Sequence, residues 1–155
     1  MNLKPLLIIL TLSAFVPACQ PTKNVLSASE AADQKPNTNL VETYWKLIEL
    51  NGKPIGPSGN GQREAHLILK TADTRVQGNS GCNSFGGTYQ LPGANQVSLS
   101  RMAATKMACM NGMETEDALF TAFEQVSTYA IRRDTLLLNS PQTAPLARFV
   151  AVTLR

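Results

Sequence analysis

Alternating apolar and polar residues dominate the chain from about residue 40 onward, and turn-forming residues interrupt the alternation regularly. In one such segment, Ala65, Leu67 and Leu69 would share a face. A period of two is typical of strands buried on one side. The pattern predicts strands over residues 43–50, 65–70, 74–78, 84–91, 96–100, 129–132, 135–138 and 148–154. Strands at this spacing favour an antiparallel meander, sandwich or barrel.

One helix interrupts the strands. Its apolar face is formed at positions i, i+3, i+4 and i+7 by Leu119, Ala122, Phe123 and Val126. We expect Asn111 to cap this helix, with Glu114 three residues later as in a capping box. Acidic residues near the predicted start would also suit the positive end of the helix dipole.

Aromatic residues mark the predicted core. We expect burial of Trp45, Phe85, Tyr89, Phe123 and Phe149. In the strand predicted over 84–91, the residues Phe85, Gly87, Tyr89 and Leu91 would share one face. A small barrel either fills with side chains or holds one small ligand. A filled core is our expectation, and a bound lipid or hydrophobic peptide is the alternative.

Residues 1–18 have the features of a signal peptide. Lys4 precedes an apolar stretch that is shorter than the roughly 20 residues of a membrane-spanning helix. The stretch ends in Val16-Pro17-Ala18-Cys19, which resembles the lipobox of bacterial lipoproteins. The resemblance implies cleavage before Cys19 and acylation of this residue, and several acyl chains anchor a protein stably. Ordinary secretion with cleavage near Ala18 is the alternative.

Composition divides the remaining chain into a tether and one domain. Residues 19–39 are rich in small and polar residues, which predicts a lipid-anchored flexible linker, and residues 40–155 suit a single domain. By resemblance to Gram-negative lipoproteins, Gln20 after the cysteine favours the outer membrane, facing the periplasm. Acylation of Cys19 makes the membrane an expected partner. The net charge of +3 is small and the charges are scattered, so we expect no binding of nucleic acid.

Three blocks in order resemble the META domain, also called the HslJ-like domain. The first is the stretch 81–89, GCNSFGGTY, and the second is 105–109, TKMAC. The third comprises Glu116, Leu119, Phe120, Phe123, Val126, Tyr129 and residues 136–138. Trp45 near the domain start also fits. The motif positions are Gly81, Cys82, Asn83, Phe85, Gly87, Tyr89, Thr105, Met107 and Cys109.

This resemblance implies an α+β fold that is mainly β. A curved antiparallel sheet would close toward a small barrel, with one helix packed on it. Members of the family are bacterial heat-induced and envelope proteins, often lipoproteins, and some are linked to tolerance of novobiocin. The fold is also similar to a lipid-binding secretion pilotin. No established catalytic activity attaches to the family.

Cys82 and Cys109 have two interpretations. As a structural disulfide they fit an oxidising envelope compartment, which the predicted export implies. As a redox pair, or with Cys82 as a reactive thiol, they would need a neighbouring base, cation or helix start to lower the thiol pKa. We expect the structural disulfide.

Other candidate chemistry is sparse. His66 is the only histidine, so no zinc site of the usual ligands is expected, and it would point outward from its strand. The glycines at 78–81 and 86–87 lack phosphate-loop spacing and predict turns and bulges. Arg132 and Arg133 would form a hairpin tip. No catalytic residue and no cofactor is expected.

These features predict a non-enzymatic envelope lipoprotein that acts in stress tolerance or assembly. The first alternative is a pilotin-like module that binds an acyl chain or hydrophobic peptide. The weaker alternative is a thiol-dependent redox protein. An envelope protein or a hydrophobic ligand is the expected partner beyond the membrane.

Overall fold

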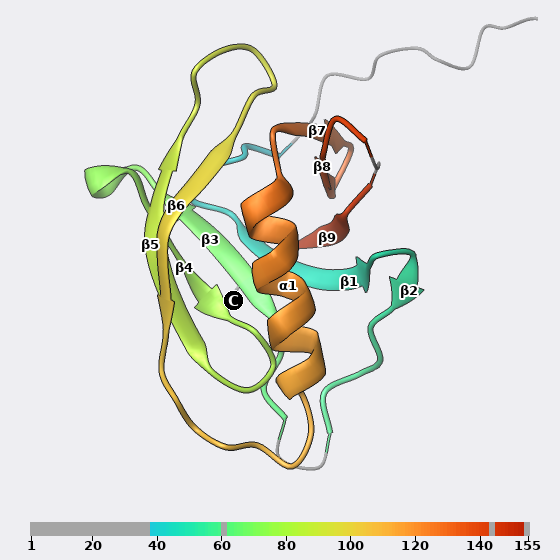
Figure 1. Cartoon of the computed structure of the whole chain (residues 1–155). Coiled ribbons are helices and arrows are strands. Elements are labelled where there is room, and N and C mark those ends of the chain that lie inside the picture. The colour runs from blue at the N-terminus through green and yellow to red at the C-terminus, as the bar shows by residue number, and fades with distance from the viewer. Residues whose placement is uncertain (1–37, 60–61, 143–144, 154–155) are drawn as a thin grey trace, which may run out of the picture. The chain divides into compact units, whose positions relative to one another are not determined.

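A computed structural model describes residues 38–59, 62–142 and 145–153, all within one compact unit (Figure 1). The signal peptide, Cys19 and most of the predicted tether lie outside the described residues. The strands are β1 (Tyr44–Leu50), β2 (Lys53–Pro54), β3 (His66–Lys70), β4 (Arg75–Asn79), β5 (Ser84–Gln90), β6 (Ser98–Ala104), β7 (Thr128–Arg132), β8 (Thr135–Asn139) and β9 (Ala147–Val152). The helices are η1 (Ala72–Thr74), a 3-10 turn, and α1 (Met113–Gln125).

Every predicted strand is present, with shifted ends. β6 runs to Ala104, four residues beyond the predicted end, because the alternation there is hidden by small residues. β2 was not predicted, since two residues cannot display a period. It pairs with β1 across the turn at Asn51 and Gly52, which both have a positive φ.

All strands join one antiparallel sheet in the order β6-β5-β4-β3-β1-β9-β8-β7, with β2 attached to β1. The sheet curls into a half-barrel around α1 (Figure 1). The predicted α+β fold, with a curved antiparallel sheet and one helix, is therefore confirmed. The first and last strands, β1 and β9, pair in the middle of the sheet.

The two ends of the sheet meet through the loop between β5 and β6. Gln96 forms an isolated bridge with Thr128 at the start of β7. The Val97 amide donates to the Ser127 carbonyl at 3.0 Å, and the Tyr129 amide donates to the Asn95 carbonyl at 2.8 Å. These bonds hold the hairpin that carries one edge strand against the other edge strand.

The concave face of the sheet and α1 enclose the core. All five predicted core aromatics are buried: Trp45, Phe85, Tyr89, Phe123 and Phe149. The Phe85 ring meets Phe123 of the helix edge to face at 5.4 Å, a favourable geometry for aromatic pairs. The prediction that Leu91 shares the face of Phe85 and Tyr89 is wrong, because Leu91 is 43% exposed. β5 ends at Gln90, so Leu91 begins the turn and no longer follows the strand's alternation.

The predicted cap of α1 is wrong. Gly112 occupies the N-cap position with a φ of 98°, no side chain caps the helix, and Asn111 is exposed. The chain reaches the helix directly from Cys109, which is tied to Cys82, and must turn sharply to enter it. A left-handed residue makes this turn, and glycine adopts that conformation without strain. The acidic residues Glu114 and Glu116 do lie in the first turn.

Candidate functional site

The motif segments meet at one end of the half-barrel. They are the β4–β5 loop, the segment between β6 and α1, and the first turn of α1. We call the residues that join them the clasp: Ser80, Cys82, Asn83, Thr105, Met107, Cys109 and Glu116. Sequence separations of up to 36 residues are bridged here. The clasp is thus a tertiary feature that no single segment shows.

Asn83 is the centre of the clasp and is only 1% exposed. Its Nδ2 donates to Glu116 Oε1 at 3.1 Å and to the Met107 carbonyl at 3.2 Å. Its Oδ1 accepts from Thr105 Oγ1 at 2.7 Å and from the Met107 amide at 2.8 Å. Both ends of the amide are therefore used within the protein, as buried polar groups require.

Glu116 brings the helix into the same network. Its Oε2 accepts from Ser80 Oγ at 2.5 Å and from the Asn83 amide at 3.2 Å. Ser80 is fully buried, so its hydroxyl has no access to solvent. A network in which each buried member has partners rigidifies its surroundings. The network therefore has a structural role: it connects the β4–β5 loop to the first turn of α1.

Cys82 and Cys109 are joined as a disulfide with their Cα atoms 5.9 Å apart, in agreement with the expected pairing. Cys82 is 2% exposed. A disulfide carries no nucleophilic thiol, and burial shields the Cys82 sulfur from exchange. The bond ties the β4–β5 loop to the segment before α1, beside the hydrogen bonds of Asn83.

The glycines around the clasp serve the packing of β4, β5 and β6. A Cβ on Gly78 would overlap the His66 carbonyl oxygen, and one on Gly87 would overlap the Met102 sulfur. Gly81 has a φ of 104° in the loop. The pairing of β5 with β6 shifts register between Gly86 and Thr88. Gly81 and the register shift fit the predicted turns and bulges, whereas Gly78 lies in the regularly paired β4 and permits close packing there.

A second polar cluster lies on β1 and β3, away from the core. The His66 ring stacks on Tyr44 with centroids 4.3 Å apart, and Lys46 pairs with Glu64 at 2.5 Å. Tyr44 donates to Glu64 Oε1 at 3.1 Å. Burial raises the pKa of Tyr44 to about 12, and the hydrogen bond to Glu64 adds to the effect. A phenol held protonated in this way is a poor base or nucleophile at neutral pH.

Metal ligands of the usual kinds do not gather in the described residues. No group of three His, Cys, Asp or Glu side chains there is placed to hold a metal ion. Arg132 ends β7 and Arg133 lies in the turn before β8, and both are exposed, as the predicted hairpin tip requires. None of the helices in that part of the chain is long and apolar enough to cross a membrane.

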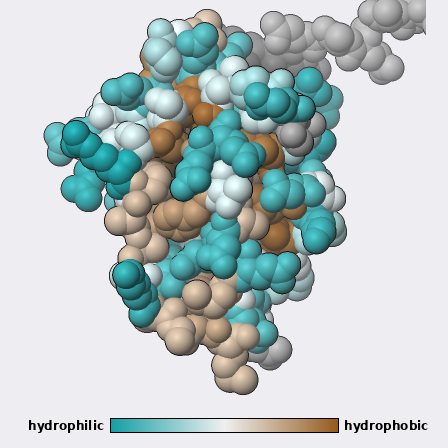
Figure 2. All heavy atoms as spheres, viewed as in Figure 1, coloured by the Kyte–Doolittle hydropathy of each residue, from teal (hydrophilic) through white to brown (hydrophobic). Residues whose placement is uncertain are grey.

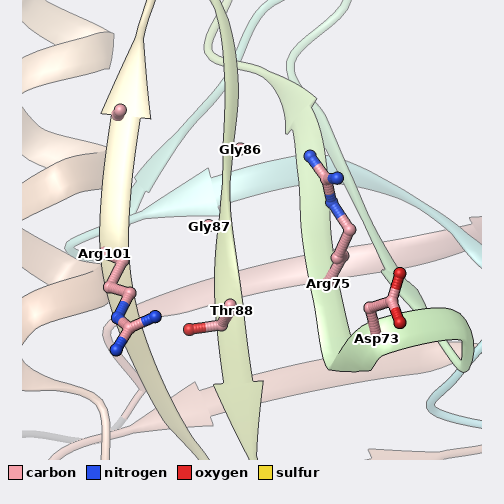
Figure 3. A pocket seen from close by; sticks show the side chains of 7 residues that line it. Asp73, Arg75, Gly86, Gly87, Thr88 and Arg101 are labelled. Carbon is pink, nitrogen blue, oxygen red and sulfur yellow. The ribbon is translucent and has the colours of Figure 1, made fainter.

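Sequence reasoning missed a hollow on the outer face of β4, β5 and β6 (Figure 3). It has a volume of about 520 Å³ and is lined by Asp73, Arg75, Gly86, Gly87, Thr88, Arg101 and Ala103. Arg75 rises from β4 and Arg101 from β6, on either side of β5 (Figure 3). No sequence pattern links two arginines on different strands, so only the strand pairing reveals the hollow.

The hollow exposes two cationic groups and the Asp73 carboxylate around Gly86, Gly87 and Thr88 of β5. Among the described residues, neither Arg75 nor Arg101 has an acidic side chain within ion-pair distance. Arg101 has a φ of 53° near the register shift of β6, and bulges of this kind re-aim side chains. A Cβ on Gly86 would meet nothing closer than the Val76 carbonyl at 3.7 Å. Interior packing therefore does not explain glycine at that position.

Comparisons with known proteins identify the fold and the family. No significant relative is found among curated proteins. A solved NMR structure of a protein from Burkholderia xenovorans is 24% identical, covers 74% of this chain and 85% of its own, and superposes with a TM-score of 0.58. A second NMR structure is 19% identical, covers 70% and 87%, and gives 0.55. The META domain model matches residues 38–153, most of the chain, so the protein belongs to the META domain family.

Proposed function

We propose that this protein is a lipid-anchored envelope protein that acts by binding, without catalysis, in envelope stress tolerance or assembly. The observation that carries the proposal is the clasp. The polar side chain at its centre, Asn83, spends all of its hydrogen-bonding capacity on other parts of the fold. The clasp thus supports a scaffold role, since its serine is buried and its two cysteines are bonded to each other.

The anchor rests on the lipobox-like end of the signal segment. Mass spectrometry of the membrane fraction should find Cys19 as the N-terminal residue carrying a diacylglyceryl group and an amide-linked acyl chain. The Cys19→Ala variant should leave the membrane fraction. An unmodified Cys19, or cleavage at another position, would refute the anchor and leave the rest of the proposal standing.

The role in stress tolerance has a genetic test. A strain that lacks the gene should lose tolerance to novobiocin, and the wild-type chain should restore it. Cys19→Ala should restore it poorly if the membrane location matters. A deletion strain indistinguishable from wild type under novobiocin and heat would argue against stress tolerance.

The outer hollow is the contact surface that we propose for an envelope partner. Free guanidinium groups beside a glycine floor suit carboxylate or phosphate groups of that partner. The double variant Arg75→Ala/Arg101→Ala should abolish complementation. Its fold should stay intact, because both side chains are exposed. Arg132→Ala/Arg133→Ala is the matched control. Equal complementation by both double variants would place the contact elsewhere.

The pilotin-like alternative receives less support from the geometry. Phe123 and Leu119 of α1 fill the concave face of the sheet, where an acyl chain would have to enter. Native mass spectrometry of the purified protein decides between the two. A co-purifying lipid would favour the alternative, and a bare protein mass would favour the filled core.

The redox alternative is tested by counting thiols. The unreduced Cys19→Ala chain should show no free thiol under denaturing conditions, because Cys82 and Cys109 form a disulfide. Two free thiols in protein taken directly from the envelope would revive a redox role.

A further inference from the structure

Three exposed methionines lie in seven consecutive residues, and the first of them, Met107, belongs to the clasp. Met107, Met110 and Met113 recur at every third position, and the whole chain has only five methionines. Their exposed fractions are 49%, 100% and 39%. Figure 2 shows residues of hydrophobic character gathered at the lower end of the molecule, where Figure 1 places the segment between β6 and α1. Core packing does not account for such exposed side chains.

The disulfide lies beside the main chain or side chain of these methionines. The Met113 Sδ lies 3.6 Å from Cys82 Sγ, and the Met107 carbonyl oxygen lies 3.4 Å from the same sulfur. Met110 directly follows Cys109, which is bonded to Cys82. Asn83 holds the main chain of Met107 through both its amide and its carbonyl. The segment is therefore fixed at several points, while Met110 is fully exposed and Met107 and Met113 are partly exposed.

Thioether sulfur is a soft, neutral ligand that selects Cu(I) over harder cations. The nearby cysteine sulfurs are bonded to each other, so they do not compete as thiolates. No cluster of His, Cys, Asp or Glu placed to hold a harder metal occurs in the described residues. We propose that Met107, Met110 and Met113 form a surface site for one Cu(I) ion. Ag(I) has the same charge and a similar softness, so it is a suitable probe that does not change oxidation state in air.

A hydrophobic docking surface would need the same exposed side chains but not their sulfur. Met→Leu substitutions separate the two, because leucine keeps the apolar character and removes the thioether. The titrations use the full chain with Cys19→Ala in every sample, unreduced, so that no free thiol can bind the ion. Isothermal titration measures Ag(I) affinity, and NMR of the methionine methyl groups reports which side chains respond.

We expect one Ag(I) per chain, with shifts of the Met107, Met110 and Met113 methyl signals and none for Met102. Met110→Leu should weaken binding by at least about tenfold. Loss of a residue that only orients a metal ligand typically costs this much affinity, and loss of the ligand itself should cost more. The triple leucine variant should not bind. Met102→Leu is the matched control and should bind as wild type. Cu(I), added without oxygen, should displace the silver ion.

Several results would overturn the site. They are undiminished Ag(I) binding by the triple variant, methyl shifts confined to Met102, no binding by the unaltered chain, or failure of Cu(I) to displace Ag(I). Circular dichroism of each variant shows whether it is folded. Because all three side chains are exposed, a variant that failed to fold would itself contradict the claim that they serve no packing role.

Discussion

At the residue scale, Asn83 decides how the motif end of the fold is held. Its Oδ1 has two partners and its Nδ2 has three, drawn from the segment after β6, from α1 and from the neighbouring Cys82 sulfur. The sequence marks Asn83 as a motif position and Glu116 as another. It does not show that they touch, because 33 residues separate them.

Replacing Asn83 with alanine should destabilise the domain strongly. The change removes the Asn83 side-chain partner of the Met107 amide and carbonyl and of Glu116 Oε1, and each orphaned group costs about 1–3 kcal/mol where it is buried. We expect the free energy of unfolding in urea to fall by about 3 kcal/mol. Asn111→Ala is the control, because Asn111 is exposed and does not cap α1. Equal effects from the two substitutions would contradict the clasp.

Tyr44 should make the domain sensitive to alkaline pH. Its pKa rises to about 12, chiefly through burial, whereas an unfolded tyrosine titrates near 10. The folded state therefore keeps the proton longer, so this contribution to stability is complete below about pH 10 and is lost as the pH rises toward 12. Ultraviolet titration should show a late tyrosinate fraction that shrinks in Tyr44→Phe and does not vanish, because burial also raises the pKa of Tyr89. Circular dichroism must show a folded protein throughout, and a single transition near pH 10 would refute the shift.

At the element scale, β4 and β5 combine two kinds of glycine. Gly78 permits close packing, since a Cβ there would lie 2.6 Å from the Phe85 ring and overlap a backbone oxygen. Gly86 faces the outer hollow with room to spare. The sequence shows only that both strands contain glycine, and the strand pairing decides which glycine the interior needs.

Alanine substitutions should separate these two positions. Gly78→Ala should lower the free energy of unfolding by about 1–3 kcal/mol, the usual cost of overpacking. Gly86→Ala should be neutral or stabilising by up to about 1 kcal/mol, because alanine loses less conformational freedom than glycine. Thermal and urea unfolding measure both. Comparable losses in the two variants would mean that Gly86 also serves the fold.

At the scale of the whole molecule, the half-barrel depends on contacts between its two sheet edges. The amides of Val97 and Tyr129 make the bonds that join the β5–β6 loop to the start of β7. These residues lie on segments separated by the whole of α1. Their meeting is therefore a property of the complete fold.

Hydrogen exchange should reveal this closure. The Val97 and Tyr129 amides should exchange about as slowly as central strand amides such as Leu47, which donates to Ala65. Amides of the exposed glycine-rich segment 56–59 should exchange fast and serve as the reference. Rapid exchange at Val97 and Tyr129 with slow exchange at Leu47 would show that the half-barrel opens at this end in solution.

The sequence by itself determined the elements, the buried faces and the family. Alternation and the spacing of apolar residues are local signals, and they located the strands, the helix and the core aromatics because each element must bury one face. The burial of Leu91 and the capping role of Asn111 were predicted wrongly. Both residues lie at the end of an element, where the path of the chain depends on tertiary contacts.

Only the tertiary structure decided which distant groups meet. Hydrogen bonds across tens of residues built the clasp, and strand pairing placed Arg75 and Arg101 around a hollow that no motif records. The fold placed Met113 against the disulfide and the main chain of Met107 against Asn83, where the sequence showed only a spacing. Local patterns fix what each segment buries, whereas partners depend on how the sheet curls, and that is settled by the packing of the whole core.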